Sequence, residues 1–160
     1  MKLGLALREL HRSEKSLAKD LLKVSDRHKA EHEIHHVARN LAAWSADHIR
    51  GLATAARRYD VELDADVPES SGPLASIRTA ISALSSSRPE PGLLLLADLR
   101  RLHRKAAGVS LDWELLAQGA QAAKDTELVE LTRRCHPQTL RQMKWTNAML
   151  KTLSPQIIAS

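Results

Sequence analysis

The sequence contains very few aromatic residues: its 160 residues include no phenylalanine, one tyrosine and three tryptophans. Alanine and leucine supply most of the apolar content instead. These two residues are strong helix formers, whereas the β-branched and aromatic residues that favour strands are scarce. The composition therefore predicts an all-α protein. A chain of this length is expected to form one domain with a substantial core.

The sequence also contains only one cysteine and no block of like charge. The single cysteine, Cys135, excludes an internal disulfide and suits a reducing cytosol. The net charge is +5, but the 24 basic residues are interleaved with 19 acidic ones. Such mixing is typical of solvated helical surfaces, so nucleic-acid binding is a less favoured alternative that rests on the positive charge alone.

Targeting signals and common catalytic motifs are missing too. The opening stretch MKLGLALRELHR reaches Arg8 and Glu9 before an apolar signal segment could form, and LLLLADLRRLH is too short to cross a bilayer. The chain has no glycine-rich phosphate loop, no Cys-x-x-Cys and no Ser–His–Asp arrangement. We therefore expect a cytoplasmic protein with no membrane segment and no cofactor.

What the sequence does contain is four long lines of apolar residues at spacings of three and four, the pattern of a helix bundle. The stretch 71–92 is rich in serine and proline and predicts a linker. The first turn has two candidate positions, 25–26 and 29–32, of which the later gives helices of matching length. Pro137 is expected to kink the fourth helix. We expect helices over about residues 2–29, 33–58, 92–123 and 126–153, with a linker over 60–91 that could enclose a short helix at 74–84.

A short internal repeat relates the two halves of the chain. The segment LRELHR at 7–12 recurs as LRRLHR at 99–104. At the same offset, the apolar line of the first predicted helix superimposes on that of the third, and the second helix matches the fourth at nearly the same offset. The sequence thus predicts two helical hairpins joined by a long crossover.

Two hairpins joined in this way resemble the ferritin-like superfamily, and the resemblance covers nearly the whole chain. Within it, ARNLAAWSADHIRGL at 38–52 is similar to the small YciF-type stress-associated bacterial proteins. It also looks like a bacterial group sometimes named molybdopterin oxidoreductase, although 160 helical residues cannot enclose a molybdopterin cleft. The resemblance implies a four-helix bundle and a protective or accessory role.

Ferritin-like enzymes hold two iron ions with inward-facing glutamates and Glu-x-x-His pairs. Glu14 lies on the core line of the first helix, as the first glutamate of that family would, but its repeat equivalent is Ala106. His48 stands where the motif histidine belongs, yet Ser45 replaces the carboxylate three residues earlier. The repeat equivalent of His48 is Gln142. The di-iron ligands are therefore mostly absent.

Glu14 and His48 should lie at the same level if the chain turns at 29–32, because each is then about 17 residues, or roughly 25 Å, from the turn. We interpret them as a buried polar pair near Gln142 that fixes helix register. The alternative is a residual iron or zinc site built on Glu14 and His48.

Histidines also gather at the start of the second helix, where His32, His35 and His36 are expected to form a solvated surface patch. The alternative is a surface zinc, nickel or copper site or a charge switch. His28 is expected to close the end of the bundle. Cys135 lies on a core line and is expected to be a packing residue.

The sequence favours a non-catalytic, ferritin-like bundle that acts through its surface, as a homo-oligomer or with a protein partner, in a stress-associated or accessory role. The leading alternative is a metal-binding protein or metal-dependent oxidase that uses Glu14 and His48. A second alternative is a basic bundle that protects DNA.

Overall fold

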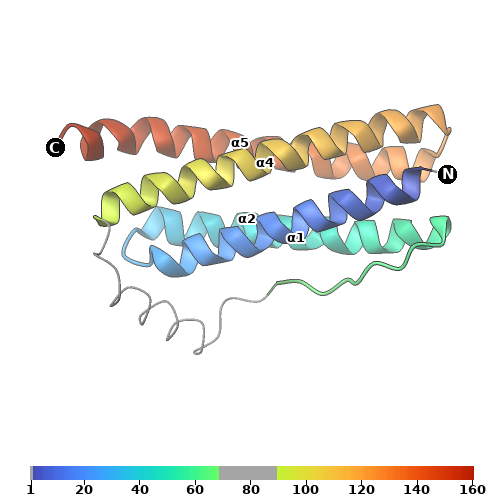
Figure 1. The fold of residues 1–160 in the computed structure, drawn as a ribbon, viewed down its shortest axis with the longest axis horizontal. Coiled ribbons are helices and arrows are strands. Elements are labelled where there is room, and N and C mark those ends of the chain that lie inside the picture. The colour runs from blue at the N-terminus through green and yellow to red at the C-terminus, as the bar shows by residue number, and fades with distance from the viewer. Residues whose placement is uncertain (1, 69–89) are drawn as a thin grey trace.

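The computed structural model describes residues 2–68 and 90–160. These residues form four long helices and one turn of 3₁₀ helix, and they contain no strand (Figure 1). The short helix predicted at 74–84 lies outside the described residues. The elements are α1 (Leu3–Arg27), α2 (His32–Ala56), η1 (Arg57–Tyr59), α4 (Pro91–Ala122) and α5 (Thr126–Ile158).

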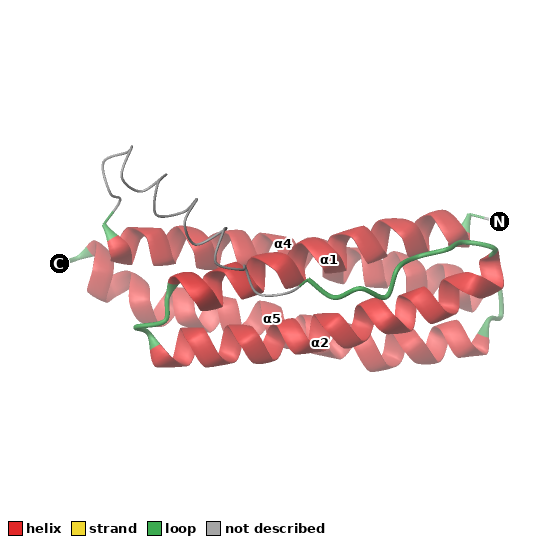
Figure 2. Cartoon of the chain, turned by 90° about the horizontal axis from the view of Figure 1, so that it is seen from below, coloured by secondary structure: helices red, strands yellow, loops and turns green. Residues whose placement is uncertain are grey.

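The helices pack as two antiparallel hairpins, α1 with α2 and α4 with α5, and α1 lies along α4 between them (Figures 1 and 2). The chain leaves η1 at the end of the bundle that holds the N-terminus, whereas α4 begins at the opposite end. The described part of the connection is fastened to α1, because His11 Nε2 lies 2.7 Å from the Asp64 carbonyl and Lys15 lies 2.6 Å from the Asp64 carboxylate. Because α2 ends near the N-terminus and α4 begins at the opposite end of the bundle, the two helices point in the same direction.

The core follows the repeat that the sequence predicts. The equivalent residues Leu17 and Val109 are both buried, as are Leu21 and Trp113. Trp44, which its apolar line also places in the core, is only partly buried.

The first turn lies at the later of its two candidate positions, since α1 ends at Arg27 and α2 begins at His32. Ser25 could have capped a helix but does not. Its hydroxyl donates to the His35 carbonyl at 2.7 Å and so joins α1 to α2. The Ser25 side chain is thus engaged across the hairpin and does not serve as an N-cap.

The fourth helix is longer than predicted and passes through Pro137 without ending. Cys135 and Thr139, on either side of this proline, both face the core, and Pro137 itself is exposed. The missing N–H of proline therefore falls on the solvent side, where water can satisfy the carbonyl that the helix leaves free.

The turn between α4 and α5 is stabilised by two terminal motifs. Lys124 adopts a left-handed backbone conformation with φ of 57°, and the amides of Lys124 and Asp125 bond to the Gln121 and Ala120 carbonyls at 3.1 and 3.0 Å. This is the Schellman arrangement, which usually has glycine at the left-handed position. Asp125 then caps α5 by accepting the Leu128 amide at 3.0 Å, and it also bonds to Tyr59.

Replacing Lys124 with glycine should stabilise the protein by about 1 kcal/mol, because glycine adopts this conformation without the steric cost of a Cβ atom. Chemical denaturation of the two proteins under identical conditions measures the difference. Ala123→Gly provides the matched control, since Ala123 has an ordinary helical φ of −79°. The control should lose stability, and a gain in both variants would contradict the explanation.

Candidate functional site

The middle of the bundle contains a carboxylate with no solvent exposure, that of Glu14 on α1. Its Oε1 atom accepts two hydrogen bonds, from Nδ1 of His48 at 2.9 Å and from Nε1 of Trp113 at 2.8 Å. His48 is on α2 and Trp113 is on α4. Three helices thus converge on one oxygen atom, which confirms that Glu14 and His48 lie at the same level.

The second ring nitrogen of His48 reaches the fourth helix. Its Nε2 atom lies 2.7 Å from Oε1 of Gln138 on α5, and the ring meets the Trp113 ring edge-on with centroids 5.8 Å apart. Both ring nitrogens of His48 therefore face acceptor oxygens. Only the imidazolium form has two N–H groups to donate, so this geometry favours protonated His48 paired with the Glu14 carboxylate.

The electrostatics of His48 agree with this assignment. Burial alone would lower the pKa of His48, because desolvation disfavours the charged ring. The hydrogen bond to Glu14 and the negative charge of that carboxylate act in the opposite direction, as does the bond to Gln138. The resulting pKa of His48 is raised above its ordinary value of 6.5.

Gln142 does not bond to this pair, although it was predicted to lie near it. Its Nε2 donates to the Leu41 carbonyl and to the Ser45 hydroxyl, both at 2.9 Å. Gln138 is the glutamine that reaches His48, and the apolar line of α5 missed it because its backbone lies off that line. Its spacing of four residues from Gln142 was the available signal, since such residues share a helix face.

Several polar atoms around the midpoint have no hydrogen-bond partner among the described residues although they are buried. They are the second carboxylate oxygen of Glu14, the Thr139 hydroxyl and the amide oxygen of Gln142. An unpaired buried acceptor costs free energy, so the polar interior is not explained by stability alone.

The residues at the midpoint do not fit a di-iron centre. Within residues 2–68 and 90–160, no group of three or more histidine, cysteine, aspartate or glutamate side chains gathers as a metal ion requires. In addition, one of the two Glu14 carboxylate oxygens already accepts a hydrogen bond from the Trp113 N–H. A hydrogen-bond donor at that position competes directly with a cation, and both nitrogens of His48 are already engaged.

Cys135 is buried in the core beside these residues. Burial raises the pKa of its thiol to about 12, and the nearby Glu14 carboxylate acts in the same direction. Because the thiolate is the reactive form, this cysteine is a packing residue and not a nucleophile.

The histidines at the start of α2 are not equivalent. His32 and His36 are exposed, and their rings lie nearly parallel with centroids 5.8 Å apart. His35 differs from the expected solvated patch, because it is partly buried and its Nδ1 lies 2.8 Å from the Ser25 carbonyl. No sequence pattern indicates this contact, since it depends on how closely the two helices approach at the turn.

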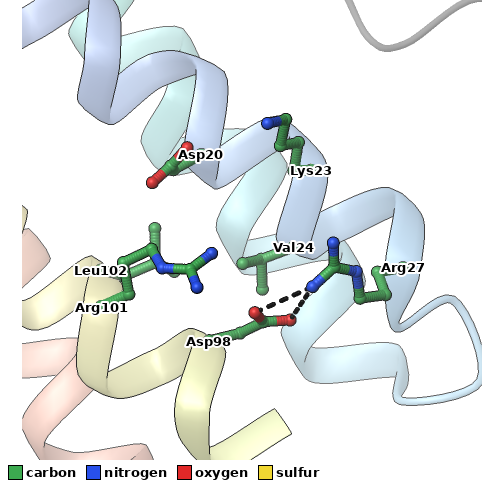
Figure 3. Close-up of a pocket in the computed structure, with 7 residues that line it drawn as sticks. All are labelled: Asp20, Lys23, Val24, Arg27, Asp98, Arg101 and Leu102. Carbon is green, nitrogen blue, oxygen red and sulfur yellow. Dashed lines mark hydrogen bonds and ion pairs between the residues drawn. The ribbon is translucent and has the colours of Figure 1, made fainter. Parts of the chain in front are cut away.

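His28 closes the same end of the bundle, where the structure adds a buried carboxylate that the sequence reading missed. His28 Nε2 lies 2.7 Å from the Asp98 carboxylate, which also accepts from Arg27 at 3.0 Å. Asp98 is only 3% exposed and borders a small pocket between α1 and α4 (Figure 3). Arg101 lines the same pocket. This cluster joins the two hairpins at their shared end.

Comparison of the chain with protein-family models, with curated proteins and with solved structures finds no match in any of the three. Among the described residues, no helix is both long enough and apolar enough to cross a membrane. The assignment of function therefore depends on the geometry of the bundle.

Replacing Glu14 with leucine should destabilise the protein by about 3 kcal/mol or more, because it leaves the buried His48 without its counter-charge. Thermal and chemical denaturation near pH 6 measure this loss. The double variant Glu14→Leu/His48→Leu should lose less than the sum of the two single variants, since the pair is removed together. Strict additivity would show that the two side chains do not interact.

The same pair should make stability depend on pH. Because the pKa of His48 is raised in the folded state, its stabilising contribution is fully present below the unfolded value of 6.5 and is lost as pH rises through the folded pKa. The difference in unfolding free energy between the protein and a His48→Gln variant should therefore shrink with rising pH above 6.5. A difference that grows over this range would show that folding lowers the pKa of His48.

Proposed function

We propose that this protein is a non-catalytic bundle of ferritin-like organisation, in which a buried hydrogen-bonded network occupies the place of a di-iron centre. The observation that supports this most directly is the Glu14 oxygen that accepts from both His48 and Trp113. Glu14, His48 and Trp113 are directed at one another at the midpoint, which suits a role in fixing helix register.

The ferritin-like part of the proposal is supported by topology. Two antiparallel hairpins are joined by a connection that starts at one end of the bundle and reaches α4 at the other (Figure 1). In the repeat that relates the two halves, Ala106 is the equivalent of Glu14 and Gln142 is the equivalent of His48. Such a substitution pattern is what the loss of a symmetric metal cage would leave.

Because the described residues assemble no reactive group at the midpoint, we place the activity of the bundle at its surface, as an accessory or stress-associated protein that forms an oligomer or binds a protein partner. The metal-dependent alternative would use Glu14 and His48. Its support is the second oxygen of Glu14, which is buried and has no partner within the described residues.

Iron loading distinguishes the non-catalytic hypothesis from the metal-dependent one. Protein purified without a histidine tag should contain iron and zinc only in substoichiometric amounts, and anaerobic addition of Fe²⁺ followed by air should produce no absorbance change of a bridged ferric centre. Elemental analysis and absorbance spectroscopy give the two measurements.

The exposed pair His32 and His36 is the main source of adventitious binding, so a His32→Asn/His36→Asn variant serves as the control background. Stoichiometric iron that persists in this background and disappears on Glu14→Gln would overturn the proposal in favour of an interior metal site.

A further inference from the structure

The face of α4 that points away from the core has an unusual sequence of exposed residues. Arg100 and Arg104 begin the line, Gly108 stands at its middle, and Leu111 and Leu115 follow. These five positions lie within a narrow arc of the helix at 100° per residue. Leu111 is 66% exposed and Leu115 is 68% exposed, so the described residues leave two neighbouring leucines on one helix face largely uncovered.

A groove runs between this face and α1. It has a volume of about 590 Å³, is lined mainly by apolar surface, and includes Gly108, Leu111 and Leu115. A Cβ atom built on Gly108 would meet no atom within 4 Å. The backbone of α4 is therefore open to close approach by another helix at the centre of the apolar stretch.

The exposed charges on α4 are segregated about Gly108. Arg100 and Arg104 lie before it, and neither has an ion-pair partner among the described residues. Asp112 and Glu114 lie after it, and Glu114 likewise has no ion-pair partner in the described part of the chain. A helix with this polarity complements a copy of itself that runs in the opposite direction, whereas a parallel copy would align like charges.

We propose that the outer face of α4 binds a second copy of this chain in an antiparallel, two-fold contact centred on Gly108 and Leu111. In this arrangement Leu111 of each copy packs over Gly108 of the other. Arg104 of each copy then lies at the level of Glu114 of its partner, which gives two equivalent ion pairs at the rim. The leucines form the apolar centre and the charges fix the direction of the partner.

The inference rests on the proposed function in one respect, that the bundle acts through its surface as an oligomer. The two can fail separately. Iron loading tests the interior and would leave the oligomeric state untouched, whereas the experiments below test the outer face of α4 and do not involve Glu14 or His48.

Sedimentation equilibrium of the full chain should give twice the mass of one chain. Leu111→Lys/Leu115→Lys should sediment as a monomer with an unchanged circular dichroism spectrum, because exposed side chains contribute little to folding. Leu140→Lys is the matched control, since Leu140 on α5 is 48% exposed but lies away from this face. A chain that stays monomeric up to about 100 µM, where even weak dimers assemble, overturns the proposal. So does a dimer that survives the double substitution.

Charge reversal tests the direction of the contact. Arg104→Glu should raise the dimer Kd about tenfold or more, because it places two acidic groups together at both ends of the interface. Arg104→Glu/Glu114→Arg should return the Kd to near its original value. Failure of this rescue while the leucine variant still dissociates would show that α4 pairs in another register or with another surface, and the antiparallel arrangement would be wrong.

Discussion

A carboxylate that is fully removed from water must be compensated within the protein, and in this bundle that constraint determines how the helices meet. Glu14 on α1 is satisfied by His48 on α2 and Trp113 on α4, and His48 extends the network to Gln138 on α5. All four helices are thus joined through directional bonds at one level. Sliding any helix by one turn, about 5.4 Å, would break at least one of these bonds. A buried charged group would then lose a hydrogen-bond partner in an apolar environment.

The network also distinguishes the two halves of a nearly symmetric chain. A uniformly apolar interior would allow the two hairpins to pack against each other at more than one relative register. Glu14 and His48 belong to one hairpin, and their equivalents Ala106 and Gln142 belong to the other. Only the observed pairing places the Trp113 N–H against Glu14, so the polar interior specifies one assembly of the hairpins. Buried polar groups that fix register in this way are well known in helical bundles.

Sequence periodicity predicted the helices and the placement of Glu14 opposite His48, because the core positions repeat at three and four residues over long stretches. The later turn followed from a requirement for equal helix lengths. Gln138 and Asp98 were missed because periodicity describes where the backbone faces, whereas long or polar side chains reach across from the edges of the core. Part of the role of Trp113 was predictable, since a buried indole N–H requires an acceptor.

The interior of the bundle and the outer face of α4 differ in which of their groups have partners within the described chain. At the midpoint, one Glu14 oxygen and both nitrogens of His48 are hydrogen-bonded to neighbours, and the atoms without partners in the described chain belong to two neutral groups and to the second oxygen of Glu14. On the outer side of α4, by contrast, Leu111 and Leu115 are largely exposed, and Arg104 and Glu114 have no ion-pair partner within the described chain. Neighbouring apolar side chains that remain exposed often mark a binding surface. In the proposed contact, the arrangement of base, glycine, leucine and acid along α4 would set both the position and the direction of the partner helix.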